Sequence, residues 1–385
     1  MEYALPYCVV AIVFLIGTIR VSPNDKITNY YLQRFVIYFI WIFFIGFRGF
    51  IVTDWQEYYP KYNQFPTFFN SSLLECLSFS KNHFWETGFV LFSIFIKSFG
   101  CNFFVYQVIS VVLDVFVLTY VFDKYSMKKY FSLCFFLYFV FQGFVTEVNL
   151  LRNSKAMILF FLSIDYINKR DAKRYFALNI LGFFFHRSAI FYFPLYWVLR
   201  VSLPKKVLCA LFFLGNIIFL LQVHWIGGVL DKLVPLFEGT SYYPLLKSYG
   251  IISGNFGGYD LGLGVIERTV TFIIVINFQE KLQLNSKTIS PYINLMYCYL
   301  FIFLYLSEVG IFVARISNLF IIAYPIIYSN IYSMLSKGNK IILFIALGVY
   351  GFLKMLAQCD EPCYGYESYL FTVPNYNERL QLLHK

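Results

Sequence analysis

The chain has 385 residues, of which 59% are hydrophobic and only 14% charged, and its mean hydropathy is +0.64. A soluble domain carries about 25% charged residues, so this composition excludes an ordinary soluble protein. The net charge of +10 would suit a nucleic-acid partner, but the positive residues lie in short loops between apolar segments. That distribution is the positive-inside pattern of a membrane protein, and we expect no nucleic-acid binding.

Apolar segments of about 16–20 residues recur along the whole chain and predict an all-α, polytopic integral membrane protein with about 10–12 transmembrane helices. We expect them to form a single membrane domain over residues 1–385. The expected spans are about 4–20, 34–51, 103–122, 130–146, 154–168, 206–224, 262–279, 290–306, 316–332 and 340–357.

The basic loops set the expected orientation. Clusters of Lys and Arg at 20–34, 124–129, 169–174, 200–206, 281–287 and 337–340 are expected on the cytoplasmic side. Both termini then lie outside, and the first helix reads as retained, because no basic region or small-residue cleavage site precedes it. The outer loops are expected at about 53–102 and 225–261, and an outer tail at about 358–385. The Gly- and Tyr-rich second loop resembles a lid over a site.

Two apolar segments do not fit simple spans. Segment 84–99 is expected as an interfacial helix, because a full crossing would place the basic loop 123–129 outside. Segment 175–199 has basic clusters at both ends but is too short for two crossings at 1.5 Å per residue. It therefore predicts a broken pair of short helices that turns at His186, next to Arg187 and Ser188.

Three arginines, Arg48, Arg152 and Arg315, lie in or beside strongly apolar stretches. A cation at such depth costs roughly 2.5–3.5 kcal/mol on insertion scales, so its presence indicates a function or a buried partner. The planar guanidinium fork suits phosphate, and we expect all three to bind substrate, with Tyr58 in the stretch after Arg48 assisting. The alternative is that each arginine snorkels to the membrane surface.

Three further residues are the candidate catalytic groups: Asp54, Glu86 and His186. A carboxylate near arginines can hold a sugar hydroxyl or act as a base, and a histidine at a helix break can do the same. The structural alternatives are a surface acid at Asp54, a favourable first-turn acid at Glu86 and a hydrogen-bonded core residue at His186. Intramembrane Asp114 is expected to pair with a buried cation, Lys155 or an arginine.

The motifs of nucleotide-dependent and metal-dependent soluble enzymes are missing from the sequence, so we expect no cofactor and no metal. The energy for a group transfer would then come from the substrate itself. The eight cysteines have no metal-ligand spacing. Cys359 with Cys363, and Cys76 with Cys101, are candidate disulfide pairs in the outer segments.

Three stretches together resemble the EpsG/Wzy group of bacterial polysaccharide polymerases: RGFIVTDWQEYY, then WETGFVLFSIFIKSFGCNFFVYQVIS, then LRNSKAMILFFLSIDYINKRDAKRYFALNILGFFFHRSAIFYFPLYWV. The resemblance covers about residues 45–200 firmly. Beyond that it rests on Arg315 and the tail around YLFTVPNY. The loop and interfacial helix after the second span are also similar to the first outer loop of GT-C-type glycosyltransferases, so a GT-C-like fold is expected.

The resemblance implies a multi-pass enzyme of the bacterial inner (cytoplasmic) membrane whose active site faces the periplasm. Its substrates would be undecaprenyl-pyrophosphate-linked glycans, both as donor and as acceptor, joined into O-antigen or a related surface polysaccharide. Membrane lipid and a chain-length regulator are the implied partners. By the family pattern, Arg48, Asp54, Glu86, Arg152, His186 and Arg315 match positions expected at the site.

Three other functions remain open at this point. An O-antigen ligase-like glycosyltransferase would use the same donor, but the low charge of loop 225–261 favours the polymerase. A flippase for lipid-linked oligosaccharide would show charges through the membrane midplane and two related halves, and neither is visible. A membrane acyltransferase would share only the lone histidine at an apolar break.

Overall fold

The computed structural model describes residues 2–19, 27–82, 85–223, 225–240, 243, 262–308 and 310–383. The chain divides into two compact units, residues 1–196 with 324–385 and residues 197–323. Within the described ranges the regular structure is entirely helical, apart from one isolated bridge between Arg48 and Ser368. The prediction of an all-helical, polytopic membrane protein is confirmed.

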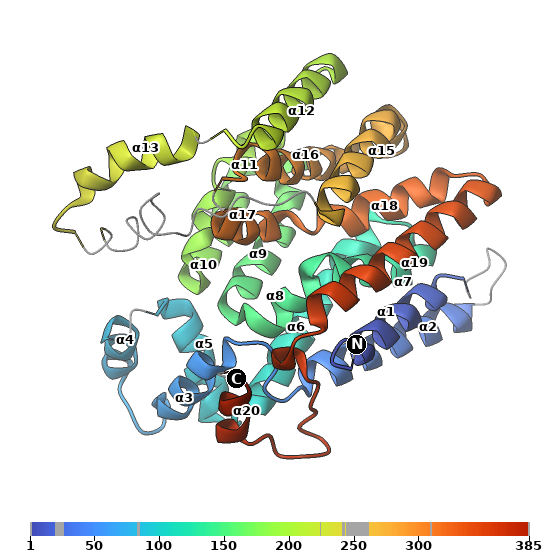
Figure 1. Ribbon diagram of the computed structural model, residues 1–385. Helices are drawn as coiled ribbons and strands as arrows, with labels where there is room; N and C mark the ends of the chain where they lie inside the picture. Colours follow the sequence, from blue (N-terminus) through green and yellow to red (C-terminus); the bar gives the residue numbers. More distant parts are fainter. Residues whose placement is uncertain are drawn as a thin grey trace. The chain divides into compact units, whose positions relative to one another are not determined.

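The first unit holds most of the helices (Figure 1). In chain order they are α1 (Leu5–Gly17), α2 (Ile27–Trp41), α3 (Trp55–Gln64), α4 (Leu73–Asn82), α5 (Thr87–Ser98), α6 (Phe103–Tyr125), α7 (Phe131–Tyr138), α8 (Phe144–Asn149), α9 (Leu151–Asn168), α10 (Ala172–Phe185), α11 (Leu195–Val198), α18 (Ala323–Met334), α19 (Lys337–Cys359) and α20 (Tyr376–Leu383). Short π-helical segments follow α2 (Ile42–Gly46) and α7 (Phe139–Gly143), and 3₁₀ helices lie at Lys128–Tyr130, Arg187–Tyr192 and Pro362–Tyr364. The last two residues of α11 and the first residue of α18 are counted with the second unit.

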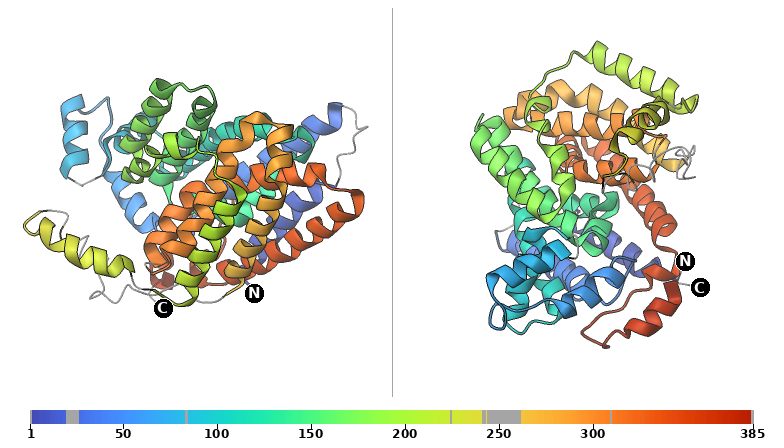
Figure 2. Two further views of the ribbon diagram at one scale, coloured as in Figure 1. Left: turned by 90° about the horizontal axis from the view of Figure 1, so that it is seen from above. Right: turned by 90° about the vertical axis from the view of Figure 1, so that its left-hand side faces the viewer.

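The second unit is built on three helices, α12 (Lys205–Leu220), α15 (Leu263–Asn285) and α16 (Ser290–Tyr305), which run side by side in yellow-green and orange in Figure 2. Its smaller elements are α13 (Trp225–Leu233), α17 (Gly310–Ser317) and 3₁₀ helices at Val234–Phe237, Lys287–Ile289 and Asn318–Phe320. Loop 225–261 therefore begins as a helix. Most of its Gly- and Tyr-rich part, which was expected to form a lid, lies outside the described residues.

Four helical stretches are long and apolar enough to cross a membrane: Phe103–Tyr125, Lys128–Asn149, Lys287–Tyr305 and Lys337–Cys359. Shorter apolar helices lie at Leu5–Gly17, Tyr30–Gly46 and Thr87–Ser98. The environments differ sharply. Every residue of α7 is buried, whereas α19 buries only Leu347, Gly351, Met355 and Cys359, which recur every fourth residue on one face.

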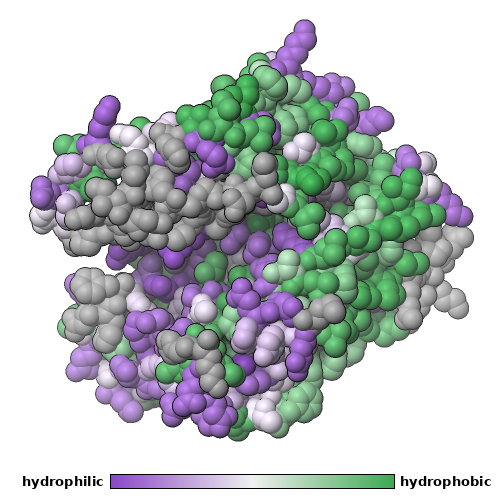
Figure 3. All heavy atoms as spheres, in the orientation of Figure 1, coloured by the Kyte–Doolittle hydropathy of each residue, from purple (hydrophilic) through white to green (hydrophobic). Residues whose placement is uncertain are grey.

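The remaining faces of α19 are apolar and exposed. Ile342, Ile345 and Val349 are each more than half exposed. Figure 3 shows the apolar side chains gathered over α19, whereas the end of the first unit that carries α3, α4 and α20 is largely hydrophilic. Water would disfavour so large an apolar surface, so the exposed faces of α19 are suited to contact lipid.

Both unusual segments form short helices, and the interfacial position of segment 84–99 stays a prediction. Helix α5 has 12 residues and is therefore about 18 Å long, well short of a bilayer core of about 30 Å. Helix α10 ends at Phe185, and His186 is extended (φ −157°, ψ 132°) before the 3₁₀ helix Arg187–Tyr192. The break at His186 is confirmed, although the second member of the pair is a 3₁₀ helix followed by the single turn α11.

Two expected spans differ in detail from the helices in the structure. Segment 316–332 is interrupted between α17 and α18. Pro325 has no backbone N–H, and it lies in the first turn of α18, where N–H groups make no intrahelical hydrogen bond. A new helix therefore begins just before Pro325. Segment 130–146 bends at Phe141 and Gln142, where the φ of Gln142 is +78°, but the helical stretch Lys128–Asn149 that contains it is long and apolar enough to cross a membrane. The predicted outer segment 53–102 contains α3, α4 and α5, and its location outside the membrane stays a prediction.

The C-terminal tail packs on the segment between α2 and α3. The backbone N–H groups of Gly49 and Val52 donate to the carbonyls of Glu367 and Cys363, at 2.8 Å each. Nearly buried Arg379 in α20 donates from Nε to the Phe50 carbonyl at 2.9 Å. These contacts hold Val52 at φ +65°, a strained conformation for a β-branched residue that turns the chain toward α3.

All eight cysteines are free thiols in the structure, including the two candidate pairs Cys359 with Cys363 and Cys76 with Cys101. Cys76 is fully buried in the aromatic core around α3, α5 and α6, where it acts as a small apolar side chain.

Candidate functional site

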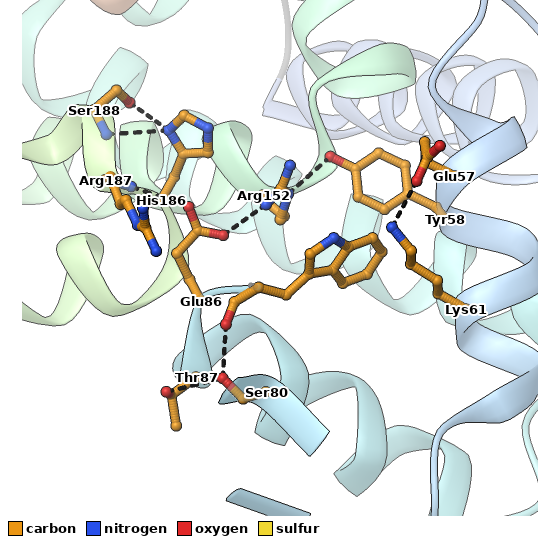
Figure 4. Close-up of polar contacts among 11 residues, drawn as sticks. Glu57, Tyr58, Lys61, Ser80, Glu86, Thr87, Arg152, His186, Arg187 and Ser188 are labelled. Carbon is orange, nitrogen blue, oxygen red and sulfur yellow. Dashed lines mark hydrogen bonds and ion pairs between the residues drawn. The ribbon is translucent and has the colours of Figure 1, made fainter. Parts of the chain in front are cut away.

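The candidate site forms in the first unit around an ion pair between Glu86 and Arg152 (Figure 4). Glu86 immediately precedes α5 and has extended backbone (φ −64°, ψ 130°). Its carboxylate does not cap α5. Instead Oε2 accepts from Nη1 of Arg152, in the first turn of α9, at 2.7 Å. The Glu86 side chain is only 9% exposed, so removing its partner would leave a largely buried carboxylate.

Aromatic side chains orient Arg152 from the other side. Nε donates to the Tyr58 hydroxyl at 3.3 Å, and the guanidinium lies 5.1 Å from the ring centre of Trp85 and 5.8 Å from that of Tyr58. Burial lowers the pKa of Arg152, but Tyr58 and Glu86 together raise it by more than burial lowers it. The pKa of Arg152 is therefore above its ordinary value. The planar Arg152 group is therefore held charged and in one orientation.

Asp54 lies one helical turn before Tyr58, at the start of α3. The backbone N–H groups of Thr53 and Asp54 both donate to Oδ1 of Asn149, at 3.1 and 2.8 Å. Burial raises the pKa of the Tyr58 hydroxyl, Arg152 lowers it, and the nearby Asp54 carboxylate raises it again. Asp54, Tyr58, Glu86 and Arg152 therefore belong to one electrostatic cluster, and their roles toward a substrate stay predictions.

His186 reaches the cluster through its neighbours. Its Nδ1 accepts from the Ser188 backbone N–H at 3.2 Å and lies 2.7 Å from the Ser188 hydroxyl, which contacts Oδ1 of Asn153 at 2.8 Å. The Ser188 hydroxyl donates to Asn153 Oδ1, and which atom donates in its contact with Nδ1 depends on the His186 tautomer. The next residue, Arg187, donates its backbone N–H to Oε1 of Glu86 at 3.4 Å.

Arg48 is placed differently from the other candidates. It is 1% exposed, and its guanidinium donates to three backbone carbonyls, those of Ile45 (2.6 Å), Glu147 (3.3 Å) and Val148 (3.1 Å). These carbonyls lie at the ends of helical segments, where they lack intrahelical partners. The structure thus gives Arg48 a structural role, and its contact with substrate stays a prediction.

Arg315 lies in α17 of the second unit and is exposed. It therefore cannot be assigned to the Glu86–Arg152 cluster, and its role stays a prediction. In the same unit, the carboxylate of Glu308 accepts from the backbone N–H groups of Ile226 and Gly227, at 2.6 and 2.9 Å. Glu308 thereby stabilises the first turn of α13.

A cleft of about 340 Å³ adjoins the Glu86–Arg152 pair. It is lined by Ser80, Lys81, Trp85, Glu86, Thr87, Phe183, Phe184 and Arg187, which come from the α4–α5 connection and the end of α10. Of these, the sequence had singled out only Glu86 as a site residue. Lys81 carries no local motif, Trp85 is the first residue of the WETG stretch, and only packing shows that both share a cleft with Arg187.

The wall of this cleft depends on a close approach at Gly88. A Cβ atom there would lie 2.8 Å from the carbonyl oxygen and 2.9 Å from Cβ of Phe184, so α5 and α10 would have to separate. We expect Gly88→Ala to destabilise the protein by about 1–3 kcal/mol and to lower its melting temperature in detergent. Gly338→Ala is the control, because nothing lies within 4 Å of that position. A wild-type melting temperature for Gly88→Ala would contradict the prediction.

A second polar cluster is buried among the helices. Asp114 of α6 pairs with Lys155 of α9, which confirms the expected partner. Lys155 also donates to the Ser110 carbonyl at 3.2 Å, and the Glu147 carboxylate, which accepts from the Tyr138 hydroxyl at 3.3 Å, adjoins Asp114. All of these side chains are buried. Over the described parts of the chain, no group of three His, Cys, Asp or Glu residues could hold a metal ion.

Comparison with known proteins gives one match. The model of the EpsG family matches residues 31–368, which is nearly the whole chain and includes every candidate site residue. No curated protein and no solved structure matches the sequence. The GT-C-like likeness therefore stays an expectation.

Proposed function

Because the chain belongs to the EpsG family, we propose that it is a glycosyltransferase that polymerises lipid-linked oligosaccharide repeat units. Family membership supports a membrane-bound role of the polysaccharide polymerase type. The finer proposal is that the donor is a glycan on undecaprenyl pyrophosphate, that the product is O-antigen or a related surface polysaccharide, and that the reaction occurs on the periplasmic face of the bacterial inner membrane. A chain-length regulator is the proposed protein partner.

The proposed reaction needs no external energy source. A hydroxyl oxygen of the acceptor glycan attacks the anomeric carbon of the donor, and a new C–O bond forms there. The bond between that carbon and the pyrophosphate oxygen breaks, and undecaprenyl pyrophosphate leaves with the electron pair. The hydroxyl proton passes to a base on the protein or to water. Positive charge near the leaving oxygens lowers the barrier, because negative charge develops on them in the transition state.

The observation that carries this proposal is the oriented Arg152. Its charge is held by Glu86 and by the rings of Tyr58 and Trp85, beside a cleft with exposed Phe side chains on one rim. A rigid cation of this kind needs little reorganisation during the reaction, which is the property that electrostatic catalysis requires. The sequence also assigns Arg315 to the donor pyrophosphate.

Asp54 is the proposed base. Its carboxylate is partly exposed and lies one turn from Tyr58, which contacts Arg152. His186 is less suited to take a proton at Nδ1 in this conformation, because Ser188 engages that atom through its backbone N–H and its hydroxyl.

The proposal is tested with purified protein in detergent and a lipid-linked repeat unit as both donor and acceptor. We expect a ladder of longer lipid-linked glycans, with one undecaprenyl pyrophosphate released for each new linkage. If lipid A is added as a second acceptor, transfer of glycan only to lipid A would indicate a ligase instead. In cells, loss of the gene should cause accumulation of single repeats on the outer face of the membrane. Accumulation on the cytoplasmic face would indicate a flippase and overturn the proposal.

A further inference from the structure

The cleft beside Glu86 has two cations whose charge is not neutralised within it. Lys81 lies in the last turn of α4, and Arg187 begins the 3₁₀ helix after α10. Among the residues that the structure describes, neither side chain makes an ion pair. Neighbouring cations are already engaged: Lys61 with Glu57, and Lys97 with the carbonyls of Tyr62, Asn63 and Phe65.

The acid in the cleft does not cancel this charge. Glu86 is the acidic residue among the lining side chains, and both of its oxygens are occupied, Oε2 by Arg152 and Oε1 by the Arg187 backbone N–H. Two cations and one carboxylate leave a formal charge of +1 on the lining, and Arg152 adds a further positive charge directly behind Glu86. An anion in the cleft is therefore attracted, and it would not displace the Glu86–Arg152 pair.

The opposite rim of the cleft is apolar. Phe183 and Phe184 are 38% and 50% exposed, and Ile180 and Leu181, one turn earlier in α10, are 49% and 46% exposed. In Figure 4 the Arg187 side chain lies next to Glu86 at the end of α10. An anionic headgroup at Arg187 would thus continue directly onto an apolar surface, which is what an amphiphile with a long hydrocarbon tail requires.

We propose that Lys81 and Arg187 bind the pyrophosphate of a polyprenyl lipid in this cleft, with the first isoprene units lying on Phe183 and Phe184. Arg187 supplies a planar fork for two phosphate oxygens, and Lys81 supplies a compact charge. Arg152, which is paired with Glu86, stabilises the charge that develops on the leaving pyrophosphate oxygen. The identity of the lipid rests on the proposed function. The anionic site itself rests on the cleft and its charges.

The test measures binding of a radiolabelled polyprenyl pyrophosphate to the purified full-length protein in detergent. We expect Arg187→Gln and Lys81→Gln each to weaken binding about tenfold, because each removes a charge-assisted contact. Arg174→Gln is the matched control, since Arg174 is an exposed arginine near the other end of α10. Inorganic pyrophosphate should bind weakly and with the same dependence on Arg187. Neutral polyprenol should bind with no such dependence.

Several results would overturn the site. The site is rejected if Arg187→Gln and Lys81→Gln both bind like the wild type, or if Arg174→Gln loses as much binding as they do. It is also rejected if polyprenol binds as tightly as polyprenyl pyrophosphate. In the polymerisation assay we expect Arg187→Gln to raise KM for the lipid-linked repeat with little change in kcat. Polymerisation with unchanged KM would reject the site but leave the proposed function standing. If lipid binding depends on Arg187 but the protein makes no polymer, the proposed function is rejected and the site stands.

Discussion

Replacing Arg152 with alanine is expected to reduce the rate of polymerisation by on the order of 10²–10³-fold, which is the usual effect of removing one group that stabilises transition-state charge. The substitution also leaves Glu86 largely buried without a partner. Arg152→Lys keeps the charge but cannot contact Glu86 and the Tyr58 hydroxyl at once through a planar fork, so we expect an intermediate rate. The measurement is the rate of chain growth by purified protein.

A charge exchange separates catalysis from structure. Glu86→Arg combined with Arg152→Glu restores an ion pair between the same two elements. If Arg152 serves only to neutralise Glu86, the double variant should regain most of its activity. If Arg152 acts on the donor, as we propose, the double variant should regain its melting temperature but remain inactive. Recovery of full activity in the exchanged protein, or a wild-type rate for Arg152→Ala, would disprove the catalytic role.

Replacing Lys155 with methionine is expected to give the largest loss of stability, about 3–5 kcal/mol. Lys155 is the cation paired with Asp114, and the Glu147 carboxylate adjoins the pair, so its removal leaves two acids among buried apolar side chains. Asp114→Asn should cost less, because Glu147 remains near Lys155 and can still balance its charge. The expected order of melting temperatures in detergent is therefore wild type, Asp114→Asn, then Lys155→Met.

The double variant Asp114→Leu/Lys155→Met tests whether the loss comes from an unpaired charge. Apolar residues of similar volume should recover much of the stability, since burying an ion pair has its own desolvation cost. Arg174→Met serves as the control for removing an exposed, paired cation, and we expect little change. Additive losses in the Asp114 and Lys155 variants would show that the two side chains are not coupled.

The cluster at Glu86 shows where sequence reasoning worked and where it stopped. It selected Asp54, Tyr58, Glu86, Arg152 and His186 because polar residues at helix ends in an apolar chain are conspicuous, and the first four form one cluster. It gave no site role to Lys81, an ordinary residue in its local context, or to Trp85, which begins the WETG stretch. It assigned Arg48 to substrate, which stays a prediction, but it gave no sign of the three backbone carbonyls that bind this guanidinium in the structure.

The sequence by itself determined the class of the protein and its local breaks. Long apolar segments require helices in a membrane, and the interruption at His186 follows from flanking charge and segment length, all of which act over a few turns of helix. The tertiary structure alone decided the partners. Glu86 and Arg152 are 66 residues apart, and Arg379 meets Phe50 across 329 residues. Such pairs depend on how helices pack, and no periodicity within one helix encodes that packing.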